Sequence, residues 1–111
     1  MAIAHALLRS GFPYYMTLGM RRVTTNPMDI GFGQEGRMYV VTRHDALGKG
    51  VRRINWDDDN LGIVAEEQFT WPAAILVDED EKLYVCDEAK HNVTVMTRDG
   101  EVLSTWGEHG A

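Results

Sequence analysis

The chain has 111 residues, of which 44% are hydrophobic and 25% are charged, and its formal net charge is −6. This composition is typical of a globular domain and excludes a disordered or collagen-like chain. Cys86 is the single cysteine, so no disulfide closes within the chain. The negative balance also excludes the broad basic surface of a general nucleic-acid-binding protein.

The first residues do not read as a secretion signal. The apolar run Ala2–Leu8 is interrupted by His5, and the first positive charge, Arg9, follows the run instead of preceding it. No stretch approaches the roughly 18 apolar residues that a membrane-spanning helix needs. The sequence therefore predicts a soluble, cytoplasmic protein with no membrane partner.

The chain contains an internal repeat. Residues 26–32 align with 71–77, and 36–41 with 81–86, at one common spacing of 45 residues. Further along the chain the spacing between the copies falls to 39 residues, where Ile54 aligns with Val93. This shift predicts about six extra residues in the first copy, in a polar loop at Asp45–Gly50.

Each copy predicts four short strands, most clearly in the second. The expected strands there are Ala73–Val77, Lys82–Asp87, Asn92–Thr97 and Val102–Trp106. They alternate apolar and polar residues or are rich in β-branched and aromatic residues. A solvated acidic turn, Asp78–Glu81, and an Asp99-Gly100 hairpin separate them. Four antiparallel strands in about 45 residues match one propeller blade, so we expect an all-β fold of two such blades.

The motifs of the second copy resemble those of a known family. They are Phe69, Pro72, Leu83-Tyr84-Val85, Asp87, His91-Asn92, Asp99-Gly100 and Trp106-Gly107. In this order they resemble an NHL repeat, so the chain looks like two consecutive NHL repeats of a β-propeller. It departs from the family pattern at Cys86, where the family has Ala, and at Glu81, where it has a turn Gly.

The resemblance implies a ring, commonly of six blades, that two blades alone do not close. We expect residues 1–25 to be an N-terminal segment with a ring-closing strand, 26–70 a first blade, 71–107 a second blade, and 108–111 the lead-in to a third repeat. The ring would be completed by oligomerisation or by further sequence.

Charge is divided unequally between the two halves. Residues 1–56 hold eight Lys or Arg and three Asp or Glu. Residues 57–111 hold three Lys or Arg and fourteen Asp or Glu. Halves of opposite sign attract head to tail, which favours a homotrimer of two-blade chains. Divergence of blade surfaces without a shared cause is the alternative explanation.

One basic cluster and two histidines are the candidate binding groups. Arg43, Arg52 and Arg53 surround the expected loop, and some NHL propellers use a basic face for RNA, although the net charge argues against nucleic acid here. His44 and His91 follow the second strand of each copy, where propeller loops line one mouth of the channel. The candidate ligand- or partner-binding residues are Arg43, His44, Arg52, Arg53, Asp87 and His91.

No catalytic or metal-binding motif stands out. The run Asp57-Asp58-Asp59 lacks the glutamate of a calcium loop, since Gln68 takes its place, and predicts a solvated turn. Cys86 lies inside an apolar strand and predicts a buried, inert thiol. We expect no cofactor and a non-enzymatic binding or scaffold module that presents loops to a protein or small ligand. The alternative is a fragment of a channel-centred, metal-dependent lyase or hydrolase.

Overall fold

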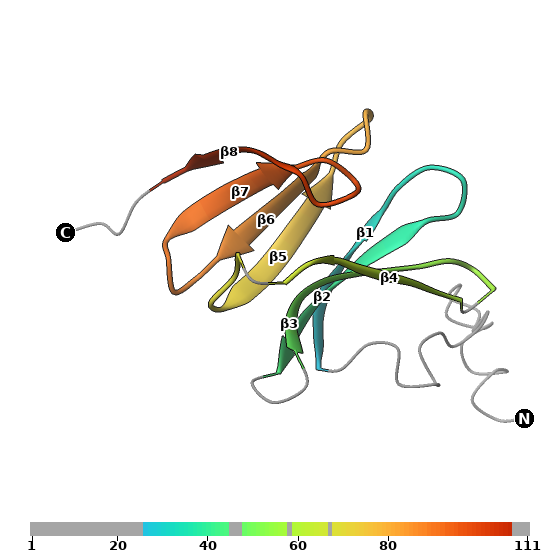
Figure 1. The fold of residues 1–111 in the computed structure, drawn as a ribbon, viewed down its shortest axis with the longest axis horizontal. Helices are drawn as coiled ribbons and strands as arrows, with labels where there is room; N and C mark the ends of the chain where they lie inside the picture. Colours follow the sequence, from blue (N-terminus) through green and yellow to red (C-terminus); the bar gives the residue numbers. More distant parts are fainter. Residues whose placement is uncertain (1–25, 45–47, 58, 67, 108–111) are drawn as a thin grey trace, which may run out of the picture.

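The computed structural model describes residues 26–44, 48–57, 59–66 and 68–107 as two four-stranded antiparallel sheets (Figure 1). The strands are β1 (Pro27–Phe32), β2 (Met38–His44), β3 (Gly48–Ile54), β4 (Asn60–Ala65), β5 (Pro72–Val77), β6 (Leu83–Asp87), β7 (Asn92–Met96) and β8 (Val102–Trp106). The predictions for residues 1–25 and 108–111 lie outside this range. No helix of sufficient length and apolarity to span a membrane occurs among the described residues.

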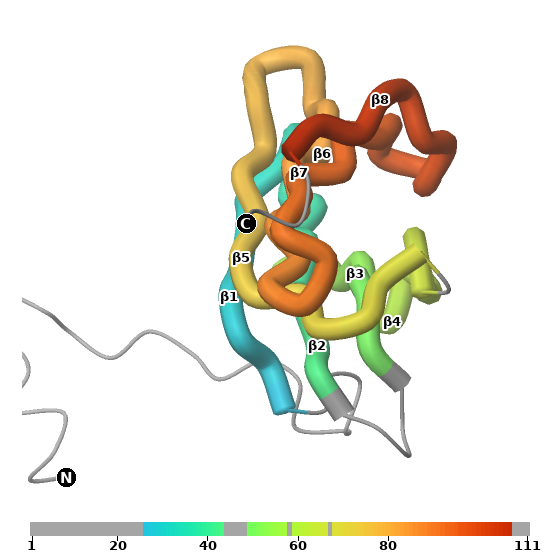
Figure 2. Tube along the Cα trace, turned by 90° about the vertical axis from the view of Figure 1, so that its left-hand side faces the viewer, coloured from blue at the N-terminus to red at the C-terminus, as the bar shows by residue number. Residues whose placement is uncertain are grey.

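Each sheet is an up-and-down meander, in the orders β1-β2-β3-β4 and β5-β6-β7-β8. The sheets lie against each other with β1 beside β5, so that the first strands of both meanders are neighbours (Figure 2). The Asp29 carboxylate accepts a hydrogen bond from the Ile75 N–H at 2.9 Å and so joins these two strands. This is the arrangement of two successive propeller blades, and the predicted fold class is confirmed.

The four strands expected in the second copy are confirmed, with ends that differ by one residue at most. The Asp99-Gly100 hairpin is also present, between β7 and β8. Gly100 has a φ of 93°, a left-handed conformation that glycine adopts without steric cost. The run Asp57–Asp59 lies between β3 and β4, where Asp57 and Asp59 are exposed, as expected of a solvated turn.

The predicted register of the third strand was wrong. Ile54 pairs with Met38, and Met96 pairs with Leu83, so Ile54 corresponds to Met96, 42 residues later. The first copy therefore has three extra residues instead of six, and Gly48–Gly50 belongs to β3 instead of a loop. Apolar alternation is similar in several registers, and only the pairing with the neighbouring strand decides among them.

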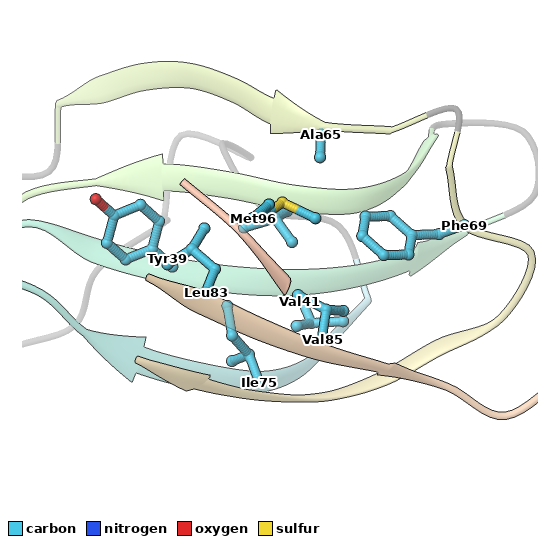
Figure 3. Close-up of a cluster of buried hydrophobic side chains, with 9 residues drawn as sticks. Tyr39, Val41, Ala65, Phe69, Ile75, Leu83, Val85 and Met96 are labelled. Atoms are coloured by element: carbon cyan, nitrogen blue, oxygen red, sulfur yellow. The ribbon is translucent and has the colours of Figure 1, made fainter. Parts of the chain in front are cut away.

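The main core lies between the two blades (Figure 3). Its buried members are Tyr39, Val41, Val51, Ala65, Phe69, Ile75, Leu83, Val85 and Met96. Alternate residues of β2 and of β6 supply it, because successive side chains of a strand point to opposite faces. Burial of each large side chain contributes about 1.5–3 kcal/mol, so this interface holds the two blades together.

Glu81 places a buried carboxylate at one end of this core. Its carboxylate accepts hydrogen bonds from Arg37 at 2.9 and 3.2 Å, from the Tyr39 hydroxyl at 3.0 Å and from the Gln34 N–H. Glu81 is only 2% exposed, so the prediction of a wholly solvated Asp78–Glu81 turn was wrong at this residue. The reason is that its partners belong to the other blade, about 44 residues earlier in the chain.

The backbone at Glu81 is left-handed, with a φ of 59°, and Gly36 occupies the same turn position in the first blade with a φ of 77°. A residue with a Cβ is disfavoured there by about 1–2 kcal/mol relative to its ordinary conformations. The interblade hydrogen bonds offset this cost, which explains why a glutamate is accommodated where the NHL pattern has glycine.

The Glu81 carboxyl is held in its charged form. Burial by itself raises the pKa of Glu81, but the hydrogen bonds from Arg37, the Gln34 N–H and Tyr39 outweigh burial and lower the pKa below its ordinary value. Burial likewise raises the pKa of the Tyr39 hydroxyl, which remains the donor in this contact.

Glu81→Gln should lower the free energy of unfolding by about 2–3 kcal/mol, because the amide keeps the shape but leaves Arg37 beside a neutral group. Urea denaturation measures the change. Glu35→Gln is the matched control, since Glu35 also pairs with Arg37, at 3.0 Å, but is 81% exposed. We expect less than about 0.5 kcal/mol there. Equal losses in the two variants would contradict a special role for the buried carboxylate.

Stability should also fall as the solution becomes acidic. A carboxyl with a lowered pKa in the folded state binds protons more weakly than in the unfolded chain, so it stabilises the fold at neutral pH. That stabilisation is lost progressively from about pH 5 downward. Urea denaturation at pH 7, 5, 4 and 3 measures the effect, and Glu81→Gln should show a smaller fall. Identical pH dependence of the two proteins would refute the assignment.

Candidate functional site

Four of the six candidate residues belong to the same end of the blades. Arg43 and His44 end β2, Asp87 ends β6, and His91 precedes β7. The linker from β4 to β5 runs past the same end and carries Trp71. We call this region the Trp71 end; its described members are Arg43, Lys49, Gln68, Trp71, Asp87, Glu88, Lys90 and His91.

Two cations lie over the half-buried ring of Trp71. The Arg43 guanidinium carbon is 4.4 Å from the ring centre and the Lys49 ammonium is 5.9 Å from it. Arg43 also donates a hydrogen bond to the Pro72 carbonyl at 3.0 Å and lies 3.3 Å from a Glu88 carboxylate oxygen. Arg43 therefore links blade one to blade two, and the cation–π contacts order this end.

Asp87 shapes the loops around Trp71. Its carboxylate accepts four backbone hydrogen bonds, from Thr70 at 2.7 Å, Trp71 at 3.1 Å, Ala89 at 3.0 Å and Lys90 at 3.1 Å. The side chain is buried; burial raises the pKa of Asp87, but these hydrogen bonds outweigh burial and lower it below its ordinary value. Its geometry is that of a positioning residue, which holds the β4–β5 linker against the β6–β7 turn.

The two histidines take different places at this end. His91 is exposed, has a left-handed φ of 54°, and lines an open groove of about 450 Å³ with Cys86, Asn92, Val93 and Trp106. His44 pairs through its backbone with Gly48 at the tip of the β2–β3 hairpin. Among the described residues, no three His, Cys, Asp or Glu side chains converge as metal ligands would.

Cys86 is exposed, so the prediction of a buried thiol was wrong. Val85 and Asp87 on either side point into the interblade core, and Cys86 must therefore point to the opposite face of blade two. The apolar strand suggested burial on both faces, whereas the described chain covers only one of them.

Arg52 and Arg53 do not form one basic patch with Arg43. Arg53 donates to the Arg98 carbonyl at 2.9 Å and to the Asp99 carboxylate at 3.0 Å, across to blade two at the end opposite Trp71. Arg52 lines a shallow hollow on the other face of blade one with Thr42 and Ile63. Period-two alternation within β3 could have separated these arginines from the sequence alone.

Sequence reasoning missed Trp71 and the pair Arg37 and Glu81 as organising residues. An aromatic residue directly before the proline of the second repeat was the available signal for Trp71, because Asn26 holds that position in the first repeat. For Glu81 the signal was an acidic residue at the turn position where Gly36 stands in the first repeat.

No protein-family model and no curated protein sequence matches the chain. Among solved structures, it is similar to a gluconolactonase from Xanthomonas campestris, with a TM-score of 0.61 and 20% sequence identity. The match covers 76% of this chain and 28% of that one, so the chain spans just over a quarter of its structural relative. The likeness supports a propeller-type fold, of which this chain supplies two blades.

The arginines of β3 provide a direct test of this geometry. Arg53→Ala should lower the free energy of unfolding by about 1–2 kcal/mol, because it removes the hydrogen bonds that connect the blades. Arg52→Ala, on the opposite face, should change it by less than about 0.5 kcal/mol. Thermal or urea unfolding compares the two. If Arg52→Ala were the more damaging, the assignment of faces in β3 would be wrong.

Proposed function

We propose that this chain is an NHL-type segment of a six-bladed β-propeller and works as a non-enzymatic binding module. It presents the loops of the Trp71 end to a protein or small ligand, and three copies form the ring. Nucleic acid and membranes are not its partners.

The observation that carries this proposal is the convergence of loops from both blades around one aromatic ring. Arg43 and Lys49 come from blade one, while Glu88 comes from blade two. Aromatic and charged groups of both signs, held by a rigid sheet scaffold, suit recognition of a polar ligand or protein surface. The four backbone bonds of Asp87 support a preformed site, which lowers the entropic cost of binding.

The NHL assignment is supported by the left-handed turn positions at Gly36 and Glu81, and by the buried Asp87 at its motif position. Gly107 of the Trp-Gly motif also needs its lack of a side chain. Its φ is 92°, and a Cβ there would lie 2.8 Å from the His91 carbonyl oxygen.

Lys49→Glu should abolish binding of a partner captured from a cell extract, because it reverses the charge beside Trp71. Lys82→Glu is the matched control, since Lys82 is an exposed lysine at the opposite end of the blades. A partner retained by the wild type and by Lys82→Glu but lost from Lys49→Glu supports the proposal. A partner lost from both variants, or from neither, contradicts binding at the Trp71 end.

The second candidate is a segment of a metal-dependent hydrolase, favoured by the likeness to a gluconolactonase. Hydrolysis of a gluconolactone by the purified protein, with and without added Ca²⁺, Zn²⁺ or Mn²⁺, tests it. A metal-dependent rate above the uncatalysed reaction that His91→Ala removes would replace the binding module with an enzyme. A rate equal to that of the buffer leaves the binding module as the better account.

A further inference from the structure

Each blade uses one apolar face in the interblade core and has a second apolar face on its other side. On blade two this open face consists of Leu76, Tyr84, Cys86, Val93 and Trp106. On blade one the open face consists of the exposed side chains of Ile30, Phe32, Trp56 and Ile63, which surround a small buried cluster of Met38, Val40 and Ile54. Trp106 is 56% exposed and Phe32 59%, which is unusual for residues of this size.

The open face of blade two repeats the face that blade one already presents to a neighbour. The strand registers place Tyr84 where blade one has Tyr39 and Val93 where it has Val51. Tyr39 and Val51 are both completely buried against blade two. The open face of blade two therefore has the pattern of a face that accepts a following blade.

The open face of blade one shows the reciprocal pattern. Ile30 stands where blade two has Ile75, and Val40 stands where it has Val85. Ile75 and Val85 are two of the four residues that blade two contributes to the interblade core. The contact inside the chain is thus a direct example of how these two kinds of face fit together.

We infer that a second copy of this chain docks head to tail, with the open face of its blade one on the open face of blade two. This deepens the proposed function, because it names the surfaces that join the copies of the ring. The repeat selects this orientation, because the two open faces match the two sides of the contact that blade one and blade two already make within the chain.

The contact between copies must differ from the internal one at its inner edge. Gly31 lies so close to blade two that a Cβ there would be 2.6 Å from a Val77 methyl carbon. At the corresponding positions between copies stand Leu76 and Phe32, which are both large. We therefore expect the inner strands of two copies to lie farther apart than β1 and β5. Gly36 replaces Glu81 at the turn, so this contact also lacks the buried carboxylate.

The solution mass of the full chain and of two single-face variants tests this inference. Light scattering on a sizing column should give a multiple of the 12.5 kDa chain mass for the wild type, about threefold for a closed ring. Trp106→Glu damages only the open face of blade two, and Trp56→Glu only that of blade one. Each should reduce the mass to that of a single chain, with circular dichroism showing a retained β-sheet.

Mixing the variants distinguishes head-to-tail pairing from symmetric pairing. Trp106→Glu keeps the open face of blade one intact, and Trp56→Glu keeps the open face of blade two intact. An equimolar mixture of the two variants should therefore form a heterodimer and nothing larger. Thr105→Glu is the matched control: it adds the same charge to the adjacent residue of β8, next to Thr94 on the other face. It should keep the wild-type mass.

Three results would overturn the inference. They are a wild type that stays monomeric up to several hundred micromolar, a folded Trp106→Glu or Trp56→Glu that keeps the full mass, and a mixture that stays monomeric. A monomeric wild type that still captures a Lys49-dependent partner refutes the docking but leaves the binding role intact. An assembled wild type without such a partner refutes the binding role but leaves the docking intact.

Discussion

A sheet with apolar residues on both faces must be covered on both sides, and the rest of this structure depends on that constraint. Within the chain the other blade covers one face of each blade, through the core around Tyr39, Leu83 and Val85. The remaining faces retain exposed aromatic residues such as Phe32 and Trp106. The same hydrophobic pattern thus creates the interblade contact and drives the association that we infer between copies.

Polar contacts at the two ends determine how the blades are set against each other. Glu81 binds Arg37 and Tyr39 at one end, and Arg43 binds the Pro72 carbonyl at the Trp71 end. Hydrophobic burial has little directional preference, whereas hydrogen bonds between charged groups require defined geometry. Together these contacts give the two sheets one relative orientation.

The contacts at the two ends also give the charged residues different roles. Arg53 and Asp87 have their polar atoms engaged with backbone groups, which gives them a role in shaping the loops and connecting the blades. Lys49 lies 5.9 Å from the centre of the Trp71 ring, and Glu88 pairs with Arg43, which lies over the same ring. A ligand at this end would therefore meet groups that the scaffold has already positioned.

The eight strands, four in each repeat, and the Asp-Gly hairpin could be predicted from the sequence, because strand alternation and turn chemistry act over a few residues. Contacts between the blades were needed to establish that Glu81 is buried, that Arg53 is the arginine that bonds to blade two, and that Cys86 is exposed. Each depends on which blade covers which face, and on the pairing of β3 with β2. Those contacts join residues far apart in the chain. The local alternation of apolar and polar residues fits several strand registers, so it does not identify the register that forms.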